Sequence, residues 1–328
     1  MMELGYKLSS EEFGPRDLVR QARQAEEAGF TFALISDHFH PWVDKQGHSP
    51  FVWGVLGGVA QVTDRLRVGT GVTCPTMRIH PVIVAQAAAT AAALMPGRFF
   101  LGVGTGENLN EHIVGHRWPP IGVRQEMLEE AVAVIRQLWQ GGYQDHHGRF
   151  YTVERARIYT RPEVLPPIYV AASGTKAAGL AGRIGDGLIM SERDPDVVRA
   201  FDGTGGRGKP RYVEMSVCWA ENEREAVKTA TEGWPIAGLA GPLVTELLIP
   251  AHFESAAEMV TEERIAKSVV CGPDPGRHAD AIHQHAEAGY THISVHQIGP
   301  DQEGFLRFYA REVIPRLGEG ARVRRPAA

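Results

Sequence analysis

The chain has 328 residues, 43% of them hydrophobic and 22% charged, which is the composition of a folded protein with a large core and excludes a disordered or fibrous one. Its formal charge is −5, and its basic residues are scattered except for a short run around Arg322, Arg324 and Arg325. Because nucleic-acid binding needs a concentrated basic surface, we expect no nucleic-acid partner.

Cysteine usage and hydropathy indicate the compartment. Cys74, Cys218 and Cys271 are far apart and form no CxxC pair, so the sequence supports neither a disulfide framework nor a cysteine zinc site. The most apolar stretch, Pro81–Met95, is too short to cross a bilayer, and the first residues lack the apolar core of a signal peptide. We therefore expect a cytoplasmic protein that does not contact a membrane.

Eight short runs along the chain are predicted to be β-strands. Most of them are continuously apolar, which is typical of parallel strands that are covered on both faces. In chain order they are Glu3–Leu8, Phe32–Asp37, Leu66–Val72, Phe99–Gly104, Ile168–Ala172, Gly187–Ser191, Tyr212–Cys218 and His292–His296.

Amphipathic segments between these strands are predicted to be helices. The pattern at Glu27–Thr31 returns at Glu287–Thr291, and the glycine in each can adopt the positive φ with which a helix ends. The regular alternation predicts a single-domain (β/α)8 TIM barrel over residues 1–328, with a doubly wound open sheet as the competing fold. The predicted helices include Arg16–Ala28, Val82–Met95, Arg124–Trp139, Thr175–Ile184 and Arg277–Ala288.

The longer loops follow the strands, at the end of a barrel where active sites form. The longest, Cys218–Ser268, is predicted to be an insertion at this C-terminal face. Its apolar stretch Trp234–Leu248 would shape the substrate pocket or pack against a partner subunit. Another irregular segment, Gly141–Arg161, is predicted to be a hairpin that crosses the barrel mouth.

The segment Ser36–Trp42, with the sequence SDHFHPW, is open to three interpretations. In the first, Asp37 caps the loop and the two histidines are half-buried hydrogen-bonding side chains. In the second, His38 and His40 have the HxH spacing of metal ligands, for which His296 is the one further histidine at a suitable strand end. In the third, one histidine takes a proton from a substrate hydroxyl while Asp37 orients its ring.

Two further segments carry candidate ligand-binding groups. Leu101–Asn110 contains GxGxG without the full dinucleotide fingerprint, so its glycines more plausibly let a flat ligand lie against the backbone, with Glu107 as an acid. In the alternative interpretation, Glu107 and Asn110 only begin the next helix. Ala172–Lys176 follows a strand and opens a helix, which makes an anion pocket, although capping by Ser173 explains part of the pattern.

Taken in order, these motifs resemble the luciferase-like superfamily of barrel enzymes, and within it the dehydrogenases that use the deazaflavin coenzyme F420. The similarity extends over nearly the whole chain. The segments that carry it are LGYKLSSEEF at 4–13, SDHFHPW at 36–42, VGTGVTCPTMRIHP at 68–81, RFFLGVGTGENLNE at 98–111 and AGRIGDG at 181–187.

The resemblance implies roles for individual residues. His38 would remove the hydroxyl proton while the substrate carbon passes a hydride to C5 of the coenzyme, and Glu107 would donate a proton toward the ring. Trp42 and Glu11 would flank the alcohol and stabilise the charged histidine. The implied coenzyme contacts are Asp37, Gly71, Val72, Cys74, Gly106, Asn110, Ser173, Gly174, Thr175 and Lys176.

Two structural features are also implied by the resemblance. The peptide bond between Gly71 and Val72 is expected to be cis, in a bulge behind the coenzyme ring. The chain is expected to form a homodimer through the helices beside the early strands.

The substrate side departs from the pattern of the sugar-phosphate enzymes. The loop 191–194 reads SERD, and Ser255 stands approximately where a lysine is expected. Arg193, Ser255 and Arg277 are the predicted substrate contacts, but the added carboxylates oppose a dianion. An uncharged alcohol or a different sugar phosphate is therefore favoured over glucose 6-phosphate.

Three other functions stay open. FMN could replace F420 in a monooxygenase, although Glu107 and the SDHFHPW segment weigh against it. A metal-dependent hydrolase could use His38, His40 and His296, but the sequence offers no convincing bridging lysine or terminal aspartate, and we expect no metal. A barrel that only binds a flavin-like ligand would leave His38 and Glu107 without a purpose.

Overall fold

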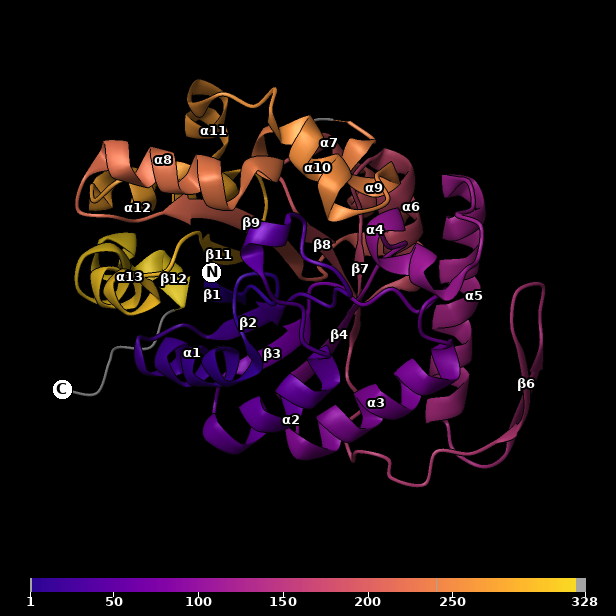
Figure 1. Ribbon diagram of the computed structural model, residues 1–328. Helices are drawn as coiled ribbons and strands as arrows, with labels where there is room; N and C mark the ends of the chain where they lie inside the picture. Colours follow the sequence, from indigo (N-terminus) through magenta and orange to yellow (C-terminus); the bar gives the residue numbers. More distant parts are fainter. Residues whose placement is uncertain (1, 240, 323–328) are drawn as a thin grey trace.

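The computed structural model describes residues 2–239 and 241–322, so Arg324 and Arg325 of the basic run lie outside it. Eight parallel strands follow one another around a closed ring, because β8 pairs with β9 and completes the circuit. The barrel prediction is therefore correct, and the open sheet is excluded (Figure 1). In ring order the strands are β1 (Met2–Leu8), β2 (Phe32–Ile35), β3 (Arg67–Thr70), β4 (Phe99–Val103), β7 (Ile168–Ala171), β8 (Gly187–Met190), β9 (Arg211–Cys218) and β11 (His292–Gln297).

Helices surround this ring. The five predicted helices are present within one to three residues at each end, and Gly29 and Gly289 have the predicted positive φ, 101° and 97°, after the first and last of them. The sequence analysis missed α2, because its sequence VWGVLGGVAQV is apolar on most sides and rich in glycine. The outer helices are α1 (Pro15–Glu27), α2 (Val52–Val62), α3 (Pro81–Leu94), α5 (Ile121–Trp139), α6 (Thr175–Ile184), α7 (Pro195–Phe201), α12 (Pro275–Glu287) and α13 (Gln302–Phe308).

Aromatic rings fill the lower part of the barrel interior. A Cβ on Gly5 would lie 2.3 Å from the Phe32 ring, and a Cβ on Gly69 would lie 2.1 Å from the Phe100 ring. Each ring therefore occupies the space that a neighbouring glycine leaves free, which is how large and small residues interdigitate in a packed interior. The Tyr212 ring lies 5.0 Å from that of Phe32 and joins this cluster.

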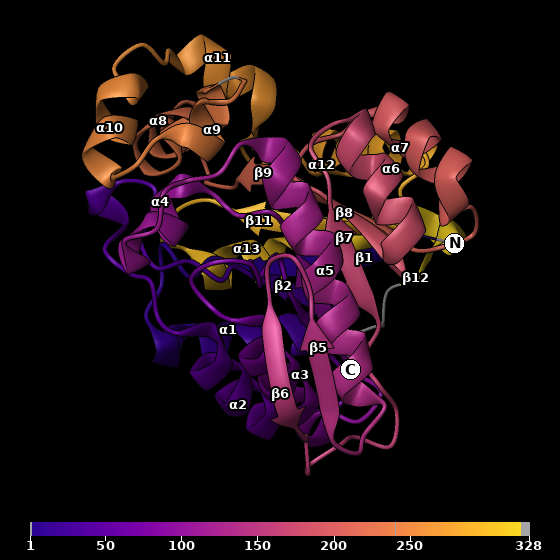
Figure 2. The same cartoon turned by 90° about the vertical axis from the view of Figure 1, so that its right-hand side faces the viewer.

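The insertion between β9 and β11 forms a second apolar cluster above the C-terminal ends of the strands. Figure 2 shows its helices gathered on one side of the molecule, next to the short helix α4 (Asn108–Glu111). Trp42 and Leu109 belong to this cluster together with Phe253 of the insertion, so the insertion is fixed on the loops that follow β2 and β4. Its elements are α8 (Glu223–Gly233), α9 (Leu243–Glu246), α10 (Pro250–Ala257), α11 (Glu262–Ser268) and β10 (Val270–Cys271).

The predicted hairpin is present as β5 (Gln144–His147) and β6 (Thr152–Ala156), but its predicted position is wrong. The Glu130 carboxylate of α5 accepts the backbone N–H groups of Arg149, Phe150 and Tyr151 at the hairpin turn. These bonds hold the hairpin along the outer side of α5 and not across the mouth, as Figure 2 also shows. Within residues 2–239 and 241–322, no helix is both long and apolar enough to cross a membrane.

Candidate active site

His38 lies at the C-terminal end of β2 and faces a buried carboxylate. Its Nδ1 atom is 3.2 Å from Oε1 of Glu11, and its ring meets the Trp42 indole edge to face at 5.0 Å. Glu11 is 2% exposed, and its other oxygen accepts hydrogen bonds from the hydroxyls of Ser9 and Ser36 at 3.1 and 2.7 Å. Since Nδ1 faces Glu11, Nε2 is the imidazole nitrogen left for a ligand.

The electrostatic environment keeps Glu11 ionised. Burial by itself would raise the pKa of this carboxyl, but the nearby charges of His38 and Lys7 and the hydrogen bond from Ser36 together lower it. A buried carboxylate that stays negative can stabilise an imidazolium that forms beside it.

Asn110 connects the His38 loop to Glu107. Its side-chain oxygen accepts the backbone N–H groups of Phe39 and His40 at 2.9 and 3.1 Å, and its side-chain nitrogen donates to Oε2 of Glu107 at 3.3 Å. Glu107 directly precedes α4 and Asn110 lies within it, as the alternative interpretation predicts for their positions. Asn110 therefore ties the backbone of the loop that carries the predicted base to the side chain of the predicted acid.

Asp37 is held from two sides. One carboxylate oxygen accepts the Thr73 hydroxyl at 2.7 Å, and the other pairs with Arg78 at 2.9 Å. Arg78 also contacts the Glu111 carboxylate at 3.4 Å. Burial and the charge of Glu107 raise the pKa of Glu111 to about 6, although Arg78 opposes this. The sequence analysis missed Arg78, whose signal is a single basic residue in the loop after β3.

The loops after β3 and β4 pack against each other through glycines. The peptide bond between Gly71 and Val72 is cis, as predicted. A Cβ on Gly104 would lie 2.7 Å from Cγ2 of Val72, and Gly106, with a φ of +74°, would place one 2.6 Å from the Cys74 sulfur. Val72 and Cys74 thus fill the space that the absence of a Cβ leaves at Gly104 and Gly106, and the two loops form one continuous wall of the mouth.

The first turn of α6 has free backbone donors. Ser173 does not cap the helix. The residue that directly precedes α6 is Gly174, which has an extended conformation, and no side chain accepts from the first N–H groups of the helix. Ser173, Thr175 and Lys176 are all exposed, and a Cβ on Gly174 would meet no atom within 4 Å. Open N–H groups at a ten-residue helix, with hydroxyls and an ammonium beside them, are suited to a phosphate.

Comparisons with known proteins identify the family of the chain. A family model described as luciferase-like monooxygenase matches residues 2–292. The chain belongs to the luciferase-like family. It is 37% identical to the F420-dependent glucose-6-phosphate dehydrogenase of Beutenbergia cavernae, over 97% of this chain and 98% of that one. The enzyme of the same name from Nocardia farcinica is 38% identical, over 96% and 98% of the two chains.

Two solved structures superpose on nearly the whole chain. An F420-dependent secondary alcohol dehydrogenase, in complex with an F420–acetone adduct, has a TM-score of 0.90 and 31% identity, over 97% of this chain and 99% of that one. The coenzyme F420 dependent tetrahydromethanopterin reductase of Methanopyrus kandleri has a TM-score of 0.80 and 22% identity, over 96% and 99%, and shows the fold alone.

The three histidines of the metal interpretation do not converge in this luciferase-like barrel. His40 Nδ1 lies 2.9 Å from the Leu109 carbonyl oxygen, whereas His296 Nε2 lies 2.9 Å from a Glu12 oxygen inside the barrel. Within the part of the chain that the structure describes, no three His, Cys, Asp or Glu side chains are placed to hold a metal ion. The hydrolase alternative therefore has no metal centre among these residues.

The predicted substrate contacts lie apart from one another. Arg193 donates to Gln284 of α12 at 3.2 Å, and Arg277 pairs with Glu223 of α8. Ser255 is exposed on α10, the helix whose Phe253 ring lies 5.2 Å from Trp42. The structure thus brings α10 to the mouth, but Arg193 is directed to the outer helix α12 and Arg277 to α8 of the insertion.

The sequence analysis did not predict Lys7, Glu12 or Glu214 at the mouth, and it named His296 only as a candidate metal ligand. Lys7 of β1 donates to the Gly71 carbonyl oxygen at 3.1 Å and lies 3.0 Å from Oε2 of Glu214 in β9. His296 and Glu12 complete this group. The available signal was an ionisable residue within a predicted strand, at Lys7, Glu214 and His296 alike.

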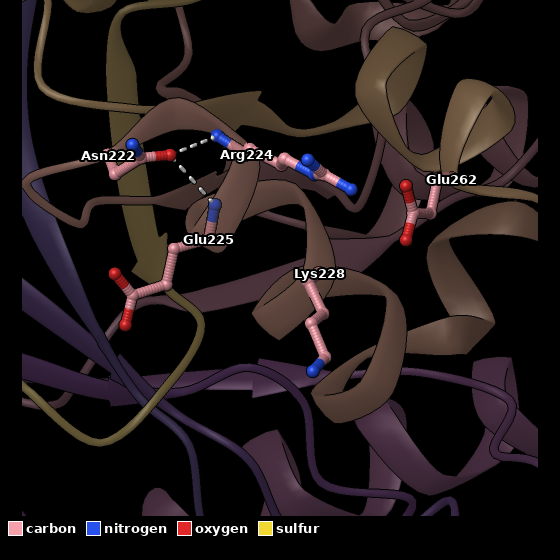
Figure 3. A pocket seen from close by; sticks show the side chains of 5 residues that line it. All are labelled: Asn222, Arg224, Glu225, Lys228 and Glu262. Carbon is pink, nitrogen blue, oxygen red and sulfur yellow. Dashed lines mark hydrogen bonds between the residues drawn. The ribbon is translucent and has the colours of Figure 1, made fainter.

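A cavity of about 400 Å³ lies elsewhere, between α8 and α11 of the insertion. Figure 3 shows its lining residues, and none of them belongs to the predicted site. Asn222 already accepts the backbone N–H groups of Arg224 and Glu225 at 2.9 and 3.3 Å, so the start of α8 has little left to offer a ligand. The mouth of the barrel remains the better candidate site.

Proposed function

We propose that the chain is an F420-dependent dehydrogenase that oxidises a hydroxyl-bearing carbon. The observation that carries the proposal is the His38–Glu11 pair at the barrel mouth. Asn110 connects the loop of His38 to the Glu107 side chain. The names of the relatives and of the neighbour with 31% identity support the same chemistry and coenzyme. FMN is the alternative coenzyme, and the binding experiment below separates the two.

In this proposal His38 acts through Nε2. Its Nδ1 faces the Glu11 carboxylate at 3.2 Å, so Nε2 accepts the proton of the substrate hydroxyl and Glu11 stabilises the resulting imidazolium. Trp42 covers the other side of the ring and restricts water. The bound deazaflavin supplies a hydride acceptor at C5. Glu107 holds the proton that is delivered toward the coenzyme.

The residues available to hold the coenzyme fit its chemistry. The wall made by Gly71, Val72, Cys74 and Gly106 is suited to a flat ring, and Asp37 and Asn110 lie at its edge. The open first turn of α6, from Ser173 and Gly174 to Thr175 and Lys176, is suited to the phosphate of the tail.

We further propose that the substrate is an uncharged alcohol. The cations at the mouth already pair with carboxylates: Lys7 with Glu214 at 3.0 Å, Arg78 with Asp37 at 2.9 Å and Arg124 with Glu246 at 2.9 Å. Above Trp42 the insertion contributes apolar side chains. A phosphate dianion would have to compete with these carboxylates, whereas an apolar alcohol would not.

Two measurements test the proposed function. Fluorescence titration of the purified protein should give tight binding of F420 and weak binding of FMN. Turnover with F420 should then be higher for a panel of secondary alcohols than for hexose phosphates. Tight binding of FMN alone would overturn the coenzyme assignment, and turnover restricted to hexose phosphates would overturn the assignment of an uncharged substrate.

A homodimer through α2 and α3 and a cytoplasmic location are also proposed. Ile83 and Leu94 of α3 are 52% and 44% exposed, and a Cβ on Gly54 or Gly57 of α2 would meet no atom within 4 Å. Apolar and small residues on adjacent helices suit a second copy of the chain. Sedimentation velocity should show a dimer that Ile83→Asp dissociates. The three cysteines are free, which fits a reducing compartment.

A further inference from the structure

A network of buried charges adjoins Glu11, the carboxylate that faces the candidate base. Lys7 Nζ lies 3.0 Å from Oε2 of Glu214, and His296 Nδ1 lies 3.6 Å from the other Glu214 oxygen. The second nitrogen of His296 lies 2.9 Å from Oε2 of Glu12. His296 is 0% exposed and Lys7 is 7% exposed, so water screens these charges weakly.

The members of this network are charged at neutral pH. Burial opposes ionisation of Glu214, but Lys7 and His296 lower its pKa to about 2. Burial likewise opposes protonation of His296, but Glu12 and Glu214 raise its pKa to about 9. The pKa of Lys7 is raised against its own burial by Glu214 and Glu11.

These charges do not cancel. Glu11, Glu12 and Glu214 contribute three negative charges, and Lys7 and His296 contribute two positive ones, which leaves one net negative charge beside the base. A net negative charge favours protonation of a neighbouring imidazole, and each further uncompensated carboxylate would favour it more strongly.

We propose that Lys7 and His296 are positioning residues that set the charge beside His38, so that this histidine is both free to accept the substrate proton and stabilised once it holds it. The inference rests on the proposed function in taking His38 as the base. Losing either cation would strengthen the affinity of His38 for the proton, and losing Glu214 would weaken it.

Three further carboxylates and one arginine also lie around His38. Glu107, after β4, interacts electrostatically with Lys7, as Glu11 does. Asp37, the chain neighbour of His38, is paired with Arg78, which also contacts Glu111. None of these residues is replaced in the variants below, so a change in the titration of His38 reports the Lys7–Glu214–His296 group.

The test is a pH titration of His38 in the protein without coenzyme, by NMR of ¹³C-labelled histidine, with the His38 signal assigned from its loss in His38→Ala. In Lys7→Met and His296→Gln the midpoint of His38 protonation should rise by about one pH unit, and in Glu214→Gln it should fall by about one unit. The double variant Lys7→Met/Glu214→Gln should restore the original midpoint, because it restores the original net charge.

Lys209→Met is the matched control. Lys209 Nζ donates to the carbonyl oxygens of Gly182 and Gly185 at 2.9 and 2.8 Å, so this variant also loses a hydrogen-bonded lysine, but near the opposite ends of the strands. Its titration should match the wild type. A midpoint that moves in the same direction in Lys7→Met and Glu214→Gln, or in neither, would overturn the inference. Glu214→Gln is nearly isosteric, so it decides the matter if Lys7→Met does not fold.

The pH profile of kcat/KM with F420 and 2-propanol separates this inference from the proposed function. If the titrations shift as expected and the profiles follow them, both stand. If the titrations shift and the profiles do not, the inferred effect of Lys7 and His296 on His38 stands, and the role of His38 as the base fails.

Discussion

Two histidines of β11 show how differently the two ends of this barrel are built. His292 is 8% exposed, and its ring stacks on Tyr212 at 4.1 Å. Burial and the charge of Arg67 lower its pKa to about 3, so it is neutral. His296, four residues further along the same strand, lies between two carboxylates that raise its pKa to about 9. One end of the interior is closed by aromatic packing, and the other contains a network of paired charges.

The two ends differ in the free-energy cost of burying their side chains. Burying ions is unfavourable unless they are paired and hydrogen-bonded, so the charged end contributes less to stability than an apolar interior of the same volume. The aromatic end has no such cost. We therefore expect substitutions at the aromatic end to change stability, and substitutions at the charged end to change chemistry.

The largest expected effect is on turnover at the charged end. His38→Ala should lower kcat by about 10²- to 10⁴-fold, because the hydroxyl proton loses its acceptor, while F420 binding is retained. Steady-state kinetics and fluorescence titration measure the two quantities. The control is His292→Asn, which should keep kcat within about twofold. Unchanged turnover in His38→Ala would remove this histidine from the mechanism.

At the aromatic end, Phe32→Ala should lower the free energy of unfolding by about 3–5 kcal/mol, because the ring that fills the space beside Gly5 is lost. Urea unfolding followed by circular dichroism gives the difference. Phe39, 51% exposed, provides the matched control, and Phe39→Ala should cost less than about 0.5 kcal/mol. Equal losses of stability in the two variants would contradict the packing described for the aromatic end of the barrel interior.

The two histidines should give stability opposite pH dependences. The raised pKa of His296, about 9, makes a stabilising contribution that is complete below pH 6.5 and lost as pH rises toward 9, at most about 3 kcal/mol. The lowered pKa of His292 makes a contribution that is complete above pH 6.5 and lost as pH falls. The advantage of wild type over His296→Gln should therefore shrink toward pH 9, and its advantage over His292→Asn should shrink toward pH 4. Parallel curves for the two variants, from urea unfolding across pH, would contradict this.

The smallest effects are expected away from both ends. Arg193 and Arg277 contact Gln284 and Glu223, so Arg193→Ala and Arg277→Ala should change kcat/KM for an uncharged alcohol by less than about twofold. The same variants assayed with hexose phosphates provide the comparison. A rise in KM of tenfold or more for a hexose phosphate would restore these arginines as substrate contacts.

Much of the fold could be predicted from local patterns. Short, mostly apolar runs marked the eight strands, and their alternation with helices predicted the closed ring. Helix α2 was missed because its nearly uniform apolar composition lacks a helical period, and the hairpin was misplaced because three backbone N–H groups that bind Glu130 leave no mark in the sequence. The cis bond at Gly71–Val72 was implied by the family resemblance and not by the residues alone.

The sequence by itself determined the strands and the loops that carry reactive side chains. Only the tertiary structure decided which charges meet, since Glu12 and His296 are 284 positions apart and become neighbours when the ring closes. It also decided their ionisation, because burial makes a charge costly and a nearby opposite charge offsets that cost. Both quantities depend on distances in space that no spacing along the chain encodes.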